Sequence, residues 1–146
     1  MIKKTDDFFV IETKNTGYYF RLTKSGHLEH IYYGKNCHFN KAYEATVPKC
    51  KYIPGNMINY SKEYSNIALE DMCLEMSSYG KGDIREPFVE IIHNDGSITC
   101  DFLYKDYEIF KIKKTLEKMP SSYDNTNQTE SLIIKLYDSQ YDIELD

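Results

Sequence analysis

The sequence has no tryptophan, and its 146 residues include only four cysteines, four prolines and seven glycines. The cysteines, Cys37, Cys50, Cys73 and Cys100, are far apart, and no histidines accompany them at the spacing of a zinc finger. The pattern therefore suggests neither a metal site nor a disulfide framework. We expect reduced, partly buried thiols.

Long apolar runs are also missing. No stretch approaches the roughly 18 consecutive apolar residues of a membrane-spanning helix. The N-terminus, MIKKTDDFFVIETK, lacks the apolar core and the cleavage site of a secretory signal. The net charge is −5, and the basic residues are scattered along the chain. These features predict a cytoplasmic protein that binds neither a membrane nor nucleic acid.

No motif of a catalytic apparatus is present. The glycine patterns of nucleotide-binding loops, the HExxH pattern of zinc proteases and the GxSxG pattern of hydrolases are all absent. The adjacent Cys37 and His38 would point to opposite faces of a strand, so they would not readily form one site of a cysteine nucleophile and its histidine base. His27 fits a turn, and His30 and His93 fit hydrogen-bonded structural residues better than ligands. We therefore expect no catalytic residue, metal or cofactor in this chain.

Aromatic residues are abundant, with fourteen tyrosines and seven phenylalanines, and they favour β-strands. Short apolar runs separated by glycine- and asparagine-containing turns predict an antiparallel meander near the N-terminus. Asn94-Asp95-Gly96 predicts the turn of a later hairpin. The strands expected from these patterns are 8–13, 18–23, 28–33, 88–93, 97–104, 106–113, 131–137 and 141–145.

Two segments do not fit this series. Residues 67–76, IALEDMCLEM, match one face of a helix but lie among strands, so both interpretations stay open and a strand is favoured. Residues 34–65 form a long irregular segment, and loops of this length are usually functional or ordered by a partner. The expected fold class is therefore all-β, an antiparallel β-sandwich with an irregular segment at 34–65.

Tyr18, Tyr19, Tyr32 and Tyr33 allow two interpretations. Their rings could stack on the C–H faces of sugars, or they could fill the core and the cross-strand pairs of a sandwich. A β-sandwich needs aromatic side chains of this kind in its interior. The core interpretation is therefore favoured.

Asp83 and Arg85 are the candidate site residues. The stretch SYGKGDIREP, residues 78–87, places them between two glycines and a proline. Gly80 and Gly82 permit backbone angles that a side chain disfavours, and Pro87 is expected to start a strand. We expect Asp83 and Arg85 to tie a structured corner by hydrogen bonds to the backbone or to each other, with substrate contact as the alternative.

Several short segments in a fixed order carry a resemblance to a known family. They are NTGYYF at 15–20, SGHLEHIYYGK at 25–35, YGKGDIREP at 79–87, DGS at 95–97, DFLYK at 101–105, MPSSY at 119–123 and LIIKL at 132–136. Over nearly the whole chain, their order and spacing resemble the N-terminal domain of glycoside hydrolase family 36 α-galactosidases.

The resemblance implies a β-supersandwich that precedes a (β/α)8 barrel. It also implies retaining hydrolysis of terminal α-galactosides such as melibiose and raffinose, commonly by a tetramer, with two barrel aspartates as the catalytic pair. Residues 1–146 are then expected to be a non-catalytic and incomplete N-terminal domain that supports the barrel and subunit assembly. A free-standing carbohydrate-binding or oligomerisation module is the alternative.

Some family members use this domain to complete the sugar site of a neighbouring subunit. The residues involved are an aspartate and an arginine from the segment that corresponds to residues 34–65. In this sequence that segment contains neither residue type, and its only acids are Glu44 and Glu63. The resemblance therefore assigns no substrate-binding residue within 34–65.

Overall fold

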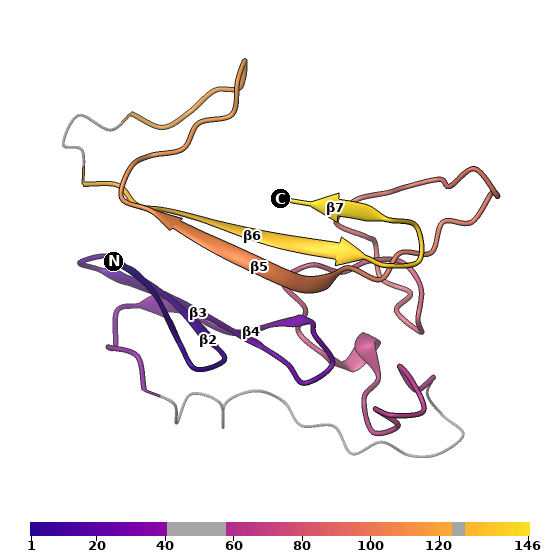
Figure 1. Ribbon diagram of the computed structural model, residues 1–146. Coiled ribbons are helices and arrows are strands. Elements are labelled where there is room, and N and C mark those ends of the chain that lie inside the picture. The colour runs from indigo at the N-terminus through magenta and orange to yellow at the C-terminus, as the bar shows by residue number, and fades with distance from the viewer. Residues whose placement is uncertain (41–57, 124–127) are drawn as a thin grey trace.

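The computed structural model describes residues 1–40, 58–123 and 128–146. In these ranges the strands form two antiparallel sheets, ordered β1-β2-β3-β4 and β5-β6-β7. Figure 1 shows the β5–β6 ribbon lying over the four-stranded sheet as a second layer. The elements are β1 Ile2–Thr5, β2 Phe8–Glu12, β3 Thr16–Leu22, β4 Leu28–Lys35, the 3-10 helix η2 Leu69–Asp71, β5 Leu103–Phe110, β6 Ser131–Asp138 and β7 Ile143–Leu145.

The four-stranded sheet buries aromatic side chains on both faces, because alternate residues of a strand point to opposite sides. On the inner face, the Phe9 ring stacks on Phe20 at 5.0 Å and meets the Tyr107 ring of β5 edge-on at 5.4 Å. On the outer face, Val10 and Tyr19 are fully buried. The all-β sandwich predicted from the sequence is confirmed, and aromatic residues form much of its core.

The second sheet separates apolar and charged side chains in the same way. Tyr104 and Leu136 are paired across β5 and β6 and pack against the inner core. On the other face, Lys135 forms an ion pair with Glu108 at 2.6 Å. This charged face points away from the four-stranded sheet.

The expected hairpin around Asn94-Asp95-Gly96 is only partly formed. The His93 amide donates to the Ser97 carbonyl at 2.8 Å, so the turn exists. Residues 88–93 are not a strand, and β5 begins only at Leu103. The Phe88 amide donates to Ser77 and the Cys100 amide donates to Tyr79, so both flanks of the turn bond to an earlier part of the chain. The predicted strand 88–93 was therefore wrong, and of the predicted strand 97–104 only Leu103 and Tyr104 belong to a strand, whereas the turn was right.

The strand favoured for residues 67–76 was also wrong. The segment forms one 3-10 turn, Leu69–Asp71, which buries Leu69. Beyond it, Cys73 accepts a hydrogen bond from the His30 amide, and the Glu75 amide donates to Leu28. These two contacts fasten the segment to the edge of β4 without building a strand.

Other sequence expectations had mixed outcomes. The meander and β6–β7 are confirmed, β1 was not predicted, and Pro87 does not start a strand. Of the segment 34–65 expected to be irregular, residues 34 and 35 belong to β4 instead, and residues 36–40 and 58–65 are irregular as expected. Residues 41–57 lie outside the described ranges. Where the structure describes them, the cysteines are free, with Cys37 and Cys73 exposed and Cys100 buried. Within the described residues, no helix has the length and hydrophobicity needed to cross a membrane.

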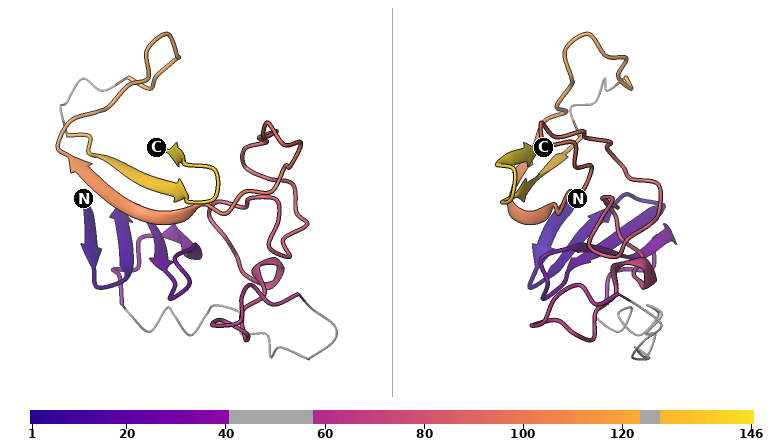
Figure 2. Two further views of the ribbon diagram at one scale, coloured as in Figure 1. Left: turned by 45° about the vertical axis from the view of Figure 1, so that its right-hand side comes forward. Right: turned by 90° about the vertical axis from the view of Figure 1, so that its right-hand side faces the viewer.

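Two irregular segments extend from opposite ends of the sandwich. Residues 58–102 lie at one end, and residues 111–123 project from the other end (Figure 2). Strand β5 runs between them. The candidate site residues predicted from the sequence lie in the first of these segments.

Candidate functional site

The corner at residues 80–83 depends on its two glycines. Gly80, Lys81 and Gly82 all have positive φ, at 122°, 53° and 89°. Gly80 and Asp83 exchange backbone hydrogen bonds of 3.1 and 2.9 Å, which close the turn. A Cβ on Gly80 would lie 2.2 Å from Cγ2 of Thr99. Glycine is therefore required at position 80 by both its backbone angle and its surroundings.

The Asp83 carboxylate is the centre of this corner. Its side chain is 0% exposed. Oδ1 accepts hydrogen bonds from the Arg85 amide at 3.1 Å and from Arg85 Nε at 2.8 Å. Oδ2 accepts from Ser77 Oγ at 2.9 Å and from Arg85 Nη2 at 2.8 Å. Each carboxylate oxygen therefore has two donors.

Arg85 links the corner to the 3-10 helix. Nη1 donates to the Met72 carbonyl at 2.6 Å, and Nη2 donates to the Leu69 carbonyl at 2.8 Å. Burial by itself raises the pKa of Asp83, but the hydrogen bonds from Arg85 outweigh it and hold that pKa below its usual value. The expected tie through hydrogen bonds is thus present in the structure, and it occupies both side chains.

A second polar cluster surrounds His27, which is buried. Its Nδ1 lies 3.0 Å from Ser25 Oγ, and its Nε2 lies 3.3 Å from Asp101 Oδ1. The Tyr60 hydroxyl donates to Asp101 Oδ2 at 2.9 Å, and the Tyr60 and His27 rings meet edge-on at 4.8 Å. The cluster joins the turn before β4 to the segment that leads into β5.

This cluster has the residue types of a serine-hydrolase triad but not its arrangement. In such triads the serine bonds to histidine Nε2 and the aspartate to Nδ1, whereas here the two nitrogens are exchanged. Ser25 is also only 5% exposed. A nucleophile must reach its substrate, so the geometry indicates a structural network.

The protein is expected to lose stability in acid through Asp83 and Asp101. Burial opposes ionisation of Asp101, but hydrogen bonds from His27 and Tyr60 lower its pKa, as Arg85 lowers that of Asp83. A lowered folded-state pKa stabilises the fold above the unfolded value of about 4, and this stabilisation disappears as the pH falls through the folded pKa. Urea unfolding at pH values on both sides of 4 measures the effect.

The variant Asp101→Asn provides the control for this pH dependence. Its free energy of unfolding should change less between neutral and acidic pH than that of the unchanged chain. A protein whose stability increased as the pH fell below 4 would contradict the assignment.

The other predicted residues have structural partners. His30 Nδ1 lies 2.7 Å from Glu75 Oε1, and the Tyr18 hydroxyl donates to the same carboxylate. His93 Nε2 lies 3.1 Å from the Thr99 carbonyl. The structural interpretation of both histidines is confirmed. Cys37 and His38 lie outside the strands, beyond the end of β4.

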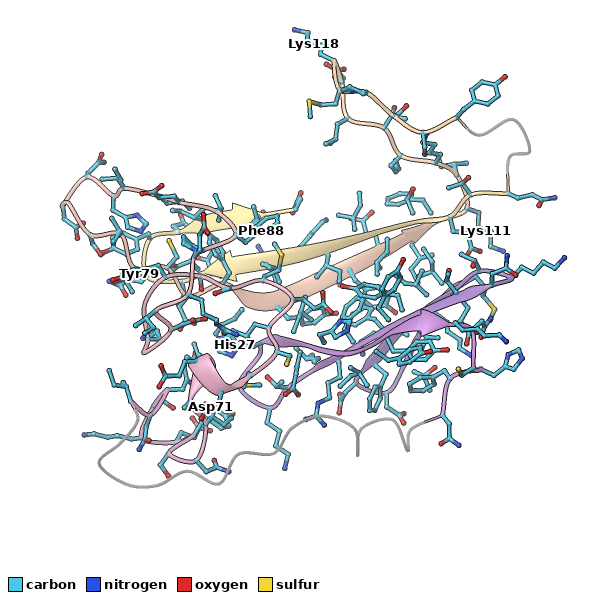
Figure 3. All side chains as sticks on the ribbon, turned by 180° about the vertical axis from the view of Figure 1, so that it is seen from behind. His27, Asp71, Tyr79, Phe88, Lys111 and Lys118 are labelled. Carbon is cyan, nitrogen blue, oxygen red and sulfur yellow. The ribbon has the colours of Figure 1, made fainter. Side chains whose placement is uncertain are left out.

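Sequence reasoning missed the partners of these histidines. His27 and Asp101 are 74 residues apart, and His30 and Glu75 are 45 residues apart. No spacing pattern indicates such pairs. Within the described ranges, no group of three or more histidine, cysteine, aspartate or glutamate side chains could hold a metal ion. Figure 3 shows the side chains of His27 and Asp71 at the end of the sandwich that also carries Tyr79.

Comparison with known proteins gives a consistent assignment. A sequence profile described as the glycosyl hydrolase family 36 N-terminal domain matches residues 26–146. The α-galactosidase AgaA of Geobacillus stearothermophilus is 27% identical over 138 residues, which cover 94% of this chain and 18% of AgaA. The bifunctional α-galactosidase/sucrose kinase AgaSK of Mediterraneibacter gnavus is 29% identical over 139 residues, which cover 94% of this chain and 14% of AgaSK.

Solved structures agree with the sequence comparison. A crystal structure of an AgaA variant in complex with raffinose superposes with a TM-score of 0.83 at 28% identity, over 94% of this chain and 19% of that one. The galactosidase domain of AgaSK gives a TM-score of 0.84 at 26% identity, and the match covers 99% of this chain and 20% of that one. The chain spans about a fifth or less of the length of these relatives. It belongs to the glycosyl hydrolase family 36 N-terminal domain family.

Proposed function

We propose that this chain is the non-catalytic N-terminal domain of a retaining α-galactosidase that hydrolyses terminal α-galactosides of the melibiose and raffinose type. In this proposal the domain supports a catalytic barrel and subunit assembly. The observation that carries it is the match of nearly the whole chain to only a fifth of α-galactosidase chains. The remaining four-fifths of those relatives leave room for a catalytic domain.

The buried carboxylates support a non-catalytic role. A retaining glycosidase needs two carboxyl groups about 5 Å apart on either side of a sugar. Asp83 is fully buried and has four hydrogen-bond donors. The Asp101 side chain is 16% exposed and is held by His27 and Tyr60. Neither carboxylate is placed to receive a substrate.

The assembly is proposed as a homo-oligomer, with a tetramer as the expected form. The location of the protein in the cytoplasm stays a prediction from the sequence. The domain boundaries 1–146, and the incompleteness of the sandwich within them, are also proposals that rest on the length of the relatives.

An activity assay tests the main proposal. The chain is incubated with raffinose and with a chromogenic α-galactoside, beside the full product of its gene. We expect turnover by the full product and none by the chain, because the proposal assigns the catalytic carboxylate pair to a barrel outside this chain. Appreciable turnover by the chain alone would overturn the proposal.

A carbohydrate-binding module is the second candidate, and Tyr33 is the observation that favours it. Tyr19 is fully buried, and the hydroxyls of Tyr18 and Tyr32 are hydrogen-bonded to other parts of the chain. Tyr33 is 71% exposed and could stack on a sugar ring. Of these four tyrosines only Tyr33 is exposed, and one ring is a small platform, so this candidate ranks second. Saturable amide shifts on titration with raffinose would favour it.

A further inference from the structure

Residues 84–92 form an irregular segment, bent at Arg85, Phe88 and Val89, whose side chains alternate in exposure. Ile84, Phe88 and Ile92 are 64–74% exposed, and Glu86 and Glu90 are exposed between them. The intervening residues are partly buried. We call the five exposed residues the acidic stripe. Its alternation is that of a strand with one solvent-facing side, although the segment belongs to no sheet in the described residues.

The backbone of this segment is largely unpaired. The Phe88 amide donates to the Ser77 carbonyl, and the Arg85 amide donates to Asp83. Among the described residues, no other backbone hydrogen bond forms within 84–92. The amides and carbonyls of Val89 and Ile91 have no backbone hydrogen-bond partner among the described residues, so they leave an open edge. An open edge of this kind can accept an additional strand.

A basic arm, residues 111–119, has complementary properties. Ile112 is 59% exposed and Leu116 is 76% exposed, with the exposed Lys114 between them. The arm contains four lysines and one glutamate, in a chain of net charge −5. Ser131 Oγ donates to the Ile112 carbonyl and accepts from the Lys114 amide, so the backbone of Lys113 and Thr115 is left on the open side.

Within one molecule the arm and the stripe cannot meet. They lie on opposite ends of β5, whose eight residues span about 26 Å at the usual rise of a strand. Figure 3 shows Lys111 at the far end of the β5–β6 ribbon from Phe88, and Lys118 near the tip of the projecting arm. A contact between the two surfaces therefore requires two molecules.

We propose that the basic arm of one molecule adds as an antiparallel strand to the acidic stripe of a second copy of this chain. The register places Ile112 opposite Ile92, Lys114 opposite Glu90 and Leu116 opposite Phe88. Lys113 then exchanges backbone hydrogen bonds with Ile91, and Thr115 with Val89.

Each feature of this register matches the chemistry of the two surfaces. Apolar side chains meet apolar side chains, and Lys114 meets the opposite charge of Glu90, as cross-strand pairs favour. The backbone groups that would pair are those left open on both segments. The inference deepens the subunit assembly of the proposed function and rests on it, because it names the surfaces that would associate.

Charge reversal tests the register. Sedimentation equilibrium of the chain over the micromolar range should show reversible association. Glu90→Lys places two like charges opposite each other and should weaken association about tenfold, and Lys114→Glu should do the same. Combining the two changes restores an opposite pair and should recover most of the affinity. Because both side chains are exposed, the fold should persist, which thermal unfolding checks.

Glu63→Lys is the matched control, because Glu63 is an exposed acid outside the stripe, and it should leave association unchanged. A chain that stays monomeric throughout would overturn both the contact and the assembly role of this chain. The arm and the stripe would then be assigned to another partner, such as the rest of a longer protein. Association that Glu90→Lys leaves intact would overturn the contact alone. Turnover by the chain would contradict the proposed function without affecting this measurement.

Discussion

Replacing Arg85 by alanine is expected to lower the free energy of unfolding by about 3 kcal/mol, because it breaks a buried ion pair by removing one partner. The Asp83 carboxylate would keep its buried position but lose two of its four donors, Arg85 Nε and Nη2. The backbone amide of residue 85 and Ser77 Oγ would remain as donors. The carbonyls of Leu69 and Met72 would each lose the hydrogen bond from Arg85, while each keeps a backbone donor. Urea unfolding measures the change.

Glu86→Ala is the control, since Glu86 is an exposed neighbour on the same segment, and a change within about 0.5 kcal/mol is expected for it. Arg85→Lys keeps the charge but not the planar fork of donors, so it should recover only part of the lost stability. A normally stable Arg85→Ala chain would contradict the structural role. A raised KM in the correspondingly changed full gene product would then indicate contact with the sugar.

Replacing Phe9 by alanine is expected to cost about 4 kcal/mol, which is typical for deleting a buried aromatic ring. Phe9 is 0% exposed and lies between the two sheets, where it contacts Phe20, Tyr104 and Tyr107. The cavity left by the missing ring would remove packing contacts with side chains of both sheets. The neighbouring strands could move little to fill it. Chemical denaturation followed by circular dichroism measures the loss.

Tyr123→Ala is the matched control for Phe9→Ala, because Tyr123 is an aromatic residue that is 91% exposed. Its replacement should change the free energy of unfolding by less than about 0.5 kcal/mol. Equal effects of the two changes would contradict the assignment of Phe9 to the space between the sheets.

Together these predictions separate stability from catalysis. The polar clusters around Asp83 and His27 have the residue types of active sites, yet their hydrogen bonds are internal, and Asp83, Ser25 and His27 are buried. Such networks hold irregular segments against a sandwich. The proposed enzymatic function depends on the relatives, and the proposal gives the described residues the role of a supporting domain.

Local signals in the sequence were reliable where neighbouring residues decide the structure. The alternation in Phe8–Glu12 places Phe9 and Val10 on opposite faces, and the glycines at 80 and 82 adopt the positive φ that only glycine accepts easily. The Asn94-Asp95-Gly96 turn also formed. The order of short motifs was sufficient to indicate the family that the comparisons then showed.

The tertiary structure alone decided which segments pair. Residues 88–92 have the alternation of a strand, but a strand in a sheet also needs a neighbour, and the flanks of the turn bond to residues 77 and 79 instead. The contacts of His27 with Asp101 and of Arg85 with Leu69 join residues far apart in the sequence. Periodicity and turn chemistry act between near neighbours, whereas such contacts depend on how the whole chain packs. The sequence by itself therefore determined the all-β class, most strands and the family resemblance, and only packing determined the polar networks and the unpaired edge at 84–92.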